Sequence, residues 1–256
     1  MFNSCQVHHM FRIWRKVKRF ADQLPGELQG FSDLYPAKNC METLVIAATS
    51  LEIGPFLDRI GSLDNRPEVL ITGVGLTAST CALTRYLATH RPECIIQAGI
   101  AGSFDPAITP GEVLLVGRDR IADQGVFENG EWKDTMDMGF TPANESPYTD
   151  GWLVNPWGFP NPGGLRLADA ISVNQVSTNP QLISEFRRKY NPSLESMEGA
   201  ALHFVAISEK IPFVQVRAVS NYVGERDKSR WDIKNAVIAL NKVLPELLSQ
   251  QQSVRP

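Results

Sequence analysis

The chain has 256 residues, of which 43% are hydrophobic, and its formal net charge is −3. A chain of this size can bury a large core, and one large domain is the expected organisation. The slightly acidic balance offers no excess of positive charge for phosphate backbones, which argues against nucleic acid as a partner. No stretch reaches the ~20 apolar residues of a membrane span.

The four cysteines are scattered, and neither a C-x-x-C nor an H-E-x-x-H pattern occurs. Isolated thiols of this kind are typical of reduced cysteines in the cytoplasm. We therefore expect a cytoplasmic protein without a metal site.

The first forty residues differ in pattern from the rest. Aromatic and aliphatic residues recur at helical spacing among arginines and lysines in FRIWRKVKRFADQL, which predicts a basic amphipathic helix. Such a helix can lie on an acidic membrane surface or bind a partner. Met41 opens METLVIAATS, which has the pattern of a first strand. We interpret residues 1–40 as an extension that is dispensable for the chemistry, and residues 41–256 as the catalytic domain.

From Thr43 onward, apolar runs of strand length alternate with helical patterns. Strands are predicted at residues 43–48, 68–73, 94–99, 112–117, 170–174 and 213–220. Helices are predicted at residues 51–60, 76–90, 179–190, 197–210 and 232–250. Continuous apolar strands imply a sheet that is covered on both faces, and hence a layered α/β fold. Residues 125–165 interrupt the rhythm with Gly, Pro, Asn and three tryptophans, as a functional insertion would.

In layered α/β folds ligands bind beyond the carboxyl ends of the strands, which directs attention to four segments. They are ATSLE, GVG, AGIAGS and SNYVGERD. Gly73, Gly75 and Ala78 fit G-x-G-x-x-A, but the next strand ends in small residues rather than the acid that a dinucleotide site requires. A tight turn with close helix packing is the preferred interpretation of these glycines.

Glu198 is the least ordinary residue of a helix that should otherwise be buried. An unpaired buried carboxylate costs several kcal/mol, so a partner is expected. From the residues alone two interpretations stay open. Glu198 is either a first-turn acid in a capping box with Glu195 or Ser196, or a functional carboxylate.

Four segments in order, VIAATSLEIGPFL, QAGIAGSF, ESMEGAAL and VRAVSN, resemble the nucleoside phosphorylase/nucleosidase superfamily, which includes the methylthioadenosine/adenosylhomocysteine nucleosidases. Within it, VRAVSNYVGERDKSRWDIKNAV is most similar to the futalosine hydrolases, and the match covers roughly residues 43–245. The resemblance implies a three-layer α/β/α fold around a central mixed sheet and a homo-oligomer. It implies a small purine nucleoside as the ligand and no cofactor, metal or organic.

The resemblance also assigns roles to individual residues. It makes Glu198 the acceptor of hydrogen bonds from the ribose hydroxyls, a task that suits a carboxylate, and Met197 a contact of the sugar. Glu52 becomes the general base that activates water, against the alternative of a solvated acid in the first turn of a helix. Arg217 would hold the water and the neighbouring carboxylates. The remaining substrate contacts that it implies are Gly99, Ala101, Gly102, Val176, Ser220 and Tyr222, with Ser177 as a looser one.

Asn221 carries the inference about the base. Adenine-specific relatives have aspartate at this position, whereas an asparagine amide can donate to N7 and to a 6-oxo group. The resemblance therefore implies hydrolysis of futalosine to hypoxanthine and dehypoxanthine futalosine, a reaction of menaquinone biosynthesis. The alternatives are a nucleosidase or phosphorylase for inosine, guanosine or a methylthioadenosine-type substrate, and a non-catalytic nucleoside-binding protein.

Two positions depart from the superfamily pattern. Ile100 stands where nucleosidases often have a hydroxyl residue, and Ser103 is the expected substitute. The early loop lacks the Gly-Asp-Pro-x-Arg of the phosphorylase anion site and carries Glu52 instead. Water is therefore the expected nucleophile.

Overall fold

The structure is a computed structural model that describes residues 43–60, 66–158 and 161–251. The predicted basic helix and the whole of the predicted extension, residues 1–40, lie outside these residues. Within the described part of the chain, no helix combines the length and the apolar character that crossing a bilayer requires.

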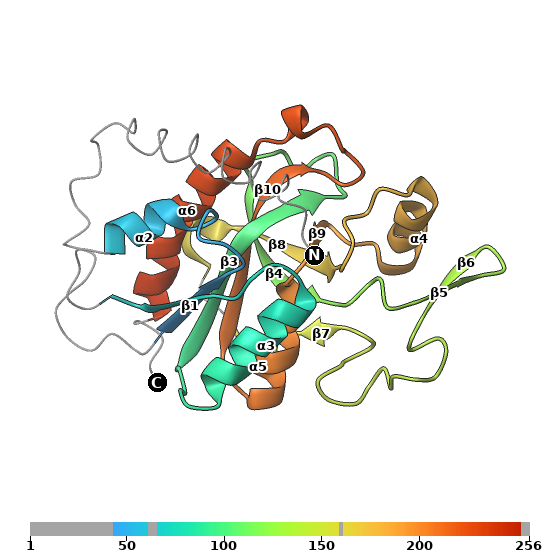
Figure 1. Cartoon of the computed structure of the whole chain (residues 1–256), viewed down its shortest axis with the longest axis horizontal. Coiled ribbons are helices and arrows are strands. Elements are labelled where there is room, and N and C mark those ends of the chain that lie inside the picture. Colours follow the sequence, from blue (N-terminus) through green and yellow to red (C-terminus); the bar gives the residue numbers. More distant parts are fainter. Residues whose placement is uncertain (1–42, 61–65, 159–160, 252–256) are drawn as a thin grey trace, which may run out of the picture. The chain divides into compact units, whose positions relative to one another are not determined.

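The described chain forms one sheet of eight strands and a separate hairpin (Figure 1). The first four strands of the sheet are β1 (Thr43–Ala47), β2 (Glu68–Ile71), β3 (Cys94–Ser103) and β4 (Val113–Asp119). The others are β7 (Leu153–Val154), β8 (Arg166–Ser172), β9 (Leu194–Ser196) and β10 (Phe213–Tyr222). All six strands predicted from the sequence are present, whereas the short β7 and β9 were not predicted.

The sheet is mixed, as expected. β3 runs parallel to β1 and to β10, whereas β9 is antiparallel to β3 and β4 is antiparallel to β10. Because β10 pairs with both β3 and β4, the path β10–β4–β8–β9–β3 closes on itself, and β1 and β2 continue outward from β3.

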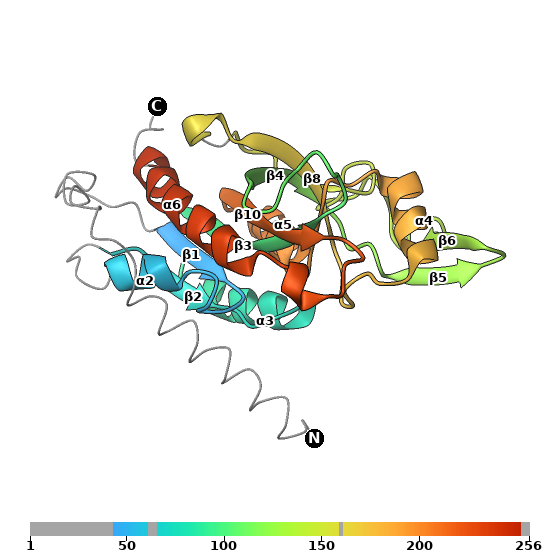
Figure 2. The same ribbon diagram turned by 90° about the horizontal axis from the view of Figure 1, so that it is seen from above.

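Alternate residues of β1 pack against different helices on the two faces of the sheet. Val45 and Ala47 join the core cluster that includes residues of α2 (Gly54–Ile60) and α6 (Ile233–Gln251). Leu44 and Ile46 join the cluster formed with α3 (Leu76–Leu87) and α5 (Gly199–Glu209). Figures 1 and 2 show these two pairs of helices from the front and from above. The buried strands are continuous in apolar residues because both of their faces are covered.

The expected insertion at residues 125–165 contains a hairpin of β5 (Gly125–Glu128) and β6 (Glu131–Asp134), beside α4 (Pro180–Tyr190) in Figure 1. Trp132 packs in a cluster with Phe186 and Tyr190, and its indole N–H donates to the Tyr190 hydroxyl at 3.0 Å. Trp152 belongs to the same cluster. Trp132 and Trp152 thus pack the insertion against α4, in a hydrophobic cluster separate from the two clusters beside β1.

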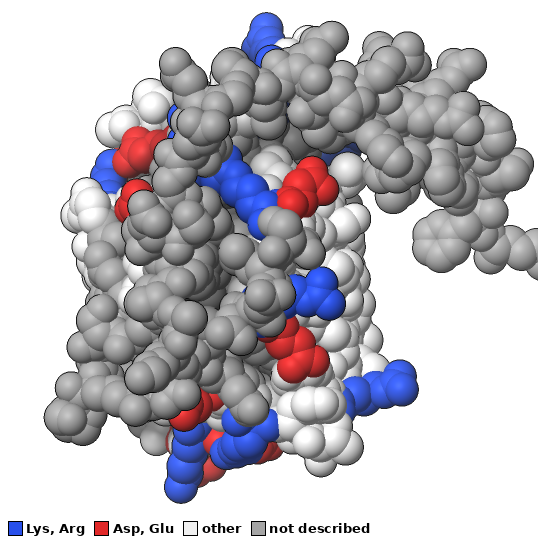
Figure 3. All heavy atoms as spheres, turned by 90° about the vertical axis from the view of Figure 1, so that its left-hand side faces the viewer, with Lys and Arg blue, Asp and Glu red and all other residues white. Residues whose placement is uncertain are grey.

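The face of the molecule that carries α2 is shown in Figure 3. Over the described residues visible there, lysine and arginine side chains are interspersed with acidic ones. No field of a single sign covers the described part of this face.

One edge of β3 changes its partner along the strand. β1 pairs with that edge as far as Gln97, and β9 pairs with it from Gly102 onward. Among the described strands, residues 98–101 have no partner on this edge, while β10 follows the whole of the opposite edge. In open α/β sheets ligands usually bind in a crevice outside the carboxyl ends of the strands, and we expect that crevice along this free edge of β3.

Candidate active site

Glu52 is buried next to the free edge of β3, in a turn that precedes α2. Its Oε1 accepts the Ile100 N–H at 3.1 Å. Its Oε2 accepts the backbone N–H of Thr49 at 2.9 Å and the Thr49 hydroxyl at 3.1 Å. The alternative of a solvated first-turn acid is therefore wrong: α2 begins at Gly54, and Glu52 is only 8% exposed.

Burial is the main influence on the proton affinity of Glu52. Removal of the carboxylate from water raises its pKa, and the nearby charge of Glu198 raises it further. Arg217 and the amides of Ile100 and Thr49 act in the opposite direction without cancelling the rise. A carboxylate with a raised pKa that is held by three donors is a suitable general base.

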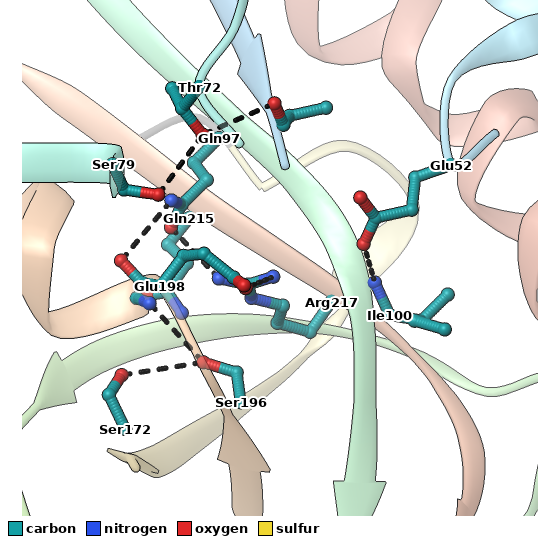
Figure 4. Close-up of polar contacts among 12 residues, drawn as sticks. Glu52, Thr72, Ser79, Gln97, Ile100, Ser172, Ser196, Glu198, Gln215 and Arg217 are labelled. Atoms are coloured by element: carbon teal, nitrogen blue, oxygen red, sulfur yellow. Dashed lines mark hydrogen bonds and ion pairs between the residues drawn. The ribbon is translucent and has the colours of Figure 1, made fainter. Parts of the chain in front are cut away.

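Arg217 lies between the two glutamates in Figure 4. It is opposite Gly99 in the register of β10 with β3, and its Nη2 donates to Oε1 of Gln97 at 3.0 Å. Its Nη1 is 3.8 Å from Oε2 of Glu198. A Cβ on Gly99 would overlap this guanidinium. The glycine thus makes room for a buried cation, a use that sequence reasoning missed.

Glu198 is the N-cap residue of α5, but its side chain makes no capping hydrogen bond. Its Oε1 instead accepts the backbone N–H of Gly75 at 2.9 Å, across 123 residues of sequence. The Gly199 N–H is taken by the Ser196 hydroxyl at 3.3 Å (Figure 4). The capping-box interpretation is therefore wrong for Glu198, whose carboxylate is turned toward the Gly73–Gly75 loop and Arg217.

A buried polar network supports the start of α5. Ser172 Oγ accepts the Ala200 N–H at 2.8 Å and donates to Oδ1 of Asp119 at 3.0 Å. Gln215 Nε2 donates to Oδ2 of the same carboxylate at 3.1 Å. A Cβ on Gly199 would overlap both Asp119 and Gln215, so the helix can approach this closely only with glycine there. Complete burial raises the pKa of Asp119 to about 6.

Asn221 is held by its neighbours at the other end of the crevice. The Ser220 hydroxyl donates to Oδ1 of Asn221 at 2.8 Å, which orients the amide. Nδ2 donates to the Tyr222 carbonyl at 3.0 Å. One N–H of the amide is left without an acceptor among the described residues. Asn221 can therefore donate one hydrogen bond to a ligand.

The remaining predicted contacts lie on neighbouring segments. Met197 and Val176 are half-buried, while Tyr222 is exposed. The expected substitution by Ser103 is wrong, because its buried hydroxyl donates to the Asp105 carbonyl at 2.9 Å within the loop that follows β3.

Comparison with known proteins places these residues in a family. No family model matches the chain. A protein named futalosine hydrolase from Thermus thermophilus is 31% identical over 192 residues, which is 73% of this chain and 83% of that protein. The chain belongs to the futalosine hydrolase family. Another futalosine hydrolase, from Streptomyces coelicolor, is 29% identical over 74% of this chain and 81% of its own length.

Nucleosidases outside the futalosine hydrolase family are also similar to the chain. A 5′-methylthioadenosine/S-adenosylhomocysteine nucleosidase from Tolumonas auensis is 27% identical over 78% of the chain and 85% of the relative. The solved futalosine hydrolase of Helicobacter pylori has a TM-score of 0.66 at 15% identity, covering 82% of this chain and 98% of that one. The nucleosidase of the same organism reaches 0.67 at 15% identity, over 83% and 100%. These structures show the α/β nucleosidase fold.

Four residues of this candidate site were not predicted from the sequence. They are Gln97, Asp119, Ser172 and Gln215, and Gly75 was predicted only as part of a tight turn. The available signal was a polar side chain within an apolar strand pattern, as at Gln97 and Gln215, because a buried polar group requires a partner. The partners themselves come from other strands and could not be read from local sequence.

Proposed function

We propose that this protein hydrolyses the N-glycosidic bond of futalosine and releases hypoxanthine and dehypoxanthine futalosine. The observation that carries the proposal is the arrangement of buried Glu52 and Glu198 on either side of Arg217, in a crevice that also presents an asparagine amide. The futalosine hydrolase relatives supply the substrate, since a nucleosidase fold alone does not specify one.

Glu198 is suited to bind the ribose. Its Oε1 is fixed by the Gly75 N–H, and Oε2 is 3.8 Å from the Arg217 guanidinium, which leaves acceptor capacity for the sugar hydroxyls. Departure of the base leaves a ribosyl oxocarbenium ion. A fixed negative charge in a site shielded from water stabilises this cation more than the neutral ground state.

Glu52 is suited to activate the attacking water. Its two oxygens are held by donors on both sides, so a water proton would be taken by a carboxylate of fixed orientation. The free amide N–H of Asn221 would be shared between N7 and O6 of the departing hypoxanthine and would stabilise the charge that develops on the base. Glu52 and Glu198 together disfavour a phosphate nucleophile at this point of the crevice.

Product analysis in phosphate buffer tests the proposal. Futalosine, inosine, guanosine, adenosine and methylthioadenosine should each be incubated with and without phosphate, and the free base and the sugar product identified. We expect hypoxanthine from futalosine and a free sugar product in both buffers. A sugar 1-phosphate detected by ³¹P NMR would identify a phosphorylase. Preferred release of adenine from methylthioadenosine would favour the other nucleosidase branch, and tight binding without any free base would indicate a binding protein.

The proposal includes the organisation expected from the sequence. With α2 and α6 on one face of the sheet and α3 and α5 on the other, the three-layer α/β/α description is supported. A cytoplasmic homo-oligomer remains part of the proposal, and size-exclusion chromatography with light scattering would test the assembly. Residues 1–40 are proposed to be dispensable, so a chain that begins at Met41 should retain turnover and melting temperature. Loss of activity in a folded shortened chain would contradict this.

A further inference from the structure

Glu195 is a second buried glutamate near the crevice, and the mechanism above does not use it. The sequence suggested an acid near the start of a helix, but the structure places Glu195 within β9, opposite Gly102 of β3. Glu195 therefore lies at the point along this edge of β3 where β9 replaces β1 as the pairing strand. Only 6% of this residue is exposed.

The two oxygens of Glu195 differ in their partners. Oε1 accepts the backbone N–H of Ser177 at 3.0 Å, whereas Oε2 is buried and has no hydrogen-bond partner among the described residues. The Ser177 hydroxyl is buried without a partner as well. Burial raises the pKa of Glu195, and the Ser177 amide and hydroxyl partly offset the rise, because that hydroxyl lies close to the carboxylate although its geometry does not meet that of a hydrogen bond. A buried acceptor without a donor is destabilising, so a donor from outside the chain would be favourable here.

Glu195 and Asn221 face the same side of the sheet. Gly102 pairs with Glu195 on one edge of β3 and with Asn221 on the other, and residues in register on adjacent strands share a face. Gly102 contributes no side chain between them, and a Cβ there would come within 3.4 Å of the Asn221 Nδ2. Val223 Cγ2 also lies 3.2 Å from that Cβ position, so the acceptor of Glu195 and the donor of Asn221 lie on either side of a glycine that is covered by Val223.

A 6-oxopurine has the complementary edge. Its O6 and N7 accept hydrogen bonds, and its N1–H donates one, whereas a 6-aminopurine donates from its amino group and accepts at N1. We propose that Glu195 is a specificity-determining residue whose Oε2 accepts the N1–H of a 6-oxopurine base while Asn221 donates to O6. This inference rests on the proposed function. It adds a second contact that distinguishes hypoxanthine from adenine.

The substitution Glu195→Gln tests the contact with little change of shape. The glutamine Oε1 can still accept the Ser177 N–H, and its amide nitrogen then replaces the unpaired acceptor with a donor. Such a site rejects the mismatched base strongly, because a buried polar group loses its partner. We expect the ratio of kcat/KM for futalosine to that for its 6-amino analogue to fall by ~10²-fold or more. An unchanged ratio would overturn the inference and leave the hydrolase assignment intact.

Glu185→Gln is the matched control. Glu185 on α4 also accepts a backbone N–H, that of Trp132 at 3.3 Å, but lies outside the crevice residues. Its substitution should leave the ratio unchanged. If Glu185→Gln lowered the kcat/KM ratio to a similar extent, the fall seen for Glu195→Gln would reflect altered packing rather than a lost contact with the base. That result would also overturn the inference.

Binding of free bases separates the inference from the proposed reaction. If the wild-type protein does not hydrolyse futalosine, titration calorimetry with hypoxanthine and adenine still tests Glu195. A selective loss of hypoxanthine affinity in Glu195→Gln supports its role, and absence of binding or of any selective loss overturns it. Should this variant fail to fold, 1-methylhypoxanthine can be compared with hypoxanthine on the wild-type protein. Weaker binding of the methylated base supports use of N1–H, and equal binding overturns it.

Discussion

The sugar end and the base end of the expected crevice differ in which polar atoms already have hydrogen-bond partners within the protein. At the sugar end, formed by Glu52, Glu198 and Arg217, each carboxylate already has protein donors and the guanidinium lies against one of them. At the base end, formed by Ser177, Glu195 and Asn221, both acceptor and donor atoms remain without partners, whereas at the sugar end the unpartnered atom among these described residues is Arg217 Nε. Charge is thus fixed in advance where an oxocarbenium ion would form, and recognition groups are left open where the base would bind.

This contrast has a physical reason. Electrostatic stabilisation of a transition state is effective when the charges need no reorganisation during the reaction. Discrimination between bases instead requires that the wrong base leave buried groups unsatisfied, which is possible only if the protein does not satisfy them itself. The two ends should therefore respond differently to substitution. Loss of charge at the sugar end should lower the rate for every substrate, and changes at the base end should alter the preference among substrates.

The largest expected effect is that of Glu52→Gln. Removal of the general base should lower kcat by about 10²–10⁴-fold for 6-oxo and 6-amino substrates alike. Because burial raises the pKa of Glu52 and its ionised form is the active one, wild-type activity should fall as the pH drops through a value above the ordinary 4.5 of glutamate. The kcat–pH profile measures this. Glu198→Gln should weaken nucleoside binding as well as turnover. A Glu52→Gln variant that kept a third of wild-type activity would show that another residue activates water.

Asn221→Asp should reverse the preference at the base end. An ionised aspartate would face O6 with a second acceptor, whereas a protonated one could donate to N7 of adenine and accept from its amino group. We expect kcat/KM for futalosine to fall by up to ~10⁴-fold and activity on the 6-amino analogue to rise. The test is to measure kcat/KM for futalosine and for its 6-amino analogue, on the wild-type protein and on Asn221→Asp. A constant ratio would mean that Asn221 does not contact the base edge.

The sequence predicts the elements that are determined locally and misses those that depend on register. The six long strands follow from continuous apolar runs, and Glu52, Glu198, Arg217 and Asn221 follow from short motifs. Strand β9 has three residues, and its pairing with β3 and β8 is a tertiary contact without a local pattern. For the same reason Glu195 was assigned to the helix start. Its unpaired oxygen becomes visible only after Ser177 and Gly102 are placed beside it.

Gly199→Ala should disturb the sugar end through packing alone. The added methyl would overlap Asp119 and Gln215 and displace the start of α5, which carries Glu198. Overpacking of this kind costs ~1–3 kcal/mol of unfolding free energy, and we expect kcat/KM to fall for all substrates. Gly54→Ala is the matched control, because a Cβ there has no atom within 4 Å. Equal stability of the two variants in urea titrations would show that the α5 contact can relax.

The smallest expected effect concerns Asp119, the buried acid that supports the start of α5. The folded-state pKa of Asp119 is raised from 3.8 to about 6, so the folded protein binds this proton more tightly than the unfolded chain. Protonated Asp119 therefore stabilises the fold most at low pH, and this stabilisation is lost as the pH rises through about 6. The total loss is ~3 kcal/mol of unfolding free energy, and roughly half of it falls between pH 5 and pH 7.5.

Asp119→Asn removes this titration and keeps the shape of the side chain. The asparagine oxygen can still accept from Ser172 and from the Arg120 N–H, and Gln215 can reverse its amide to accept from the new NH₂ group. The stability of the variant relative to wild type should therefore increase by ~1 kcal/mol from pH 5 to pH 7.5, as measured by urea unfolding at both pH values. Burial lowers the pKa of His203 to about 4, an opposite dependence that both proteins share and that cancels in the difference. If the difference were the same at both pH values, Asp119 would be ionised throughout. The start of α5 would then rest on a charged carboxylate rather than on one that is protonated below pH 6.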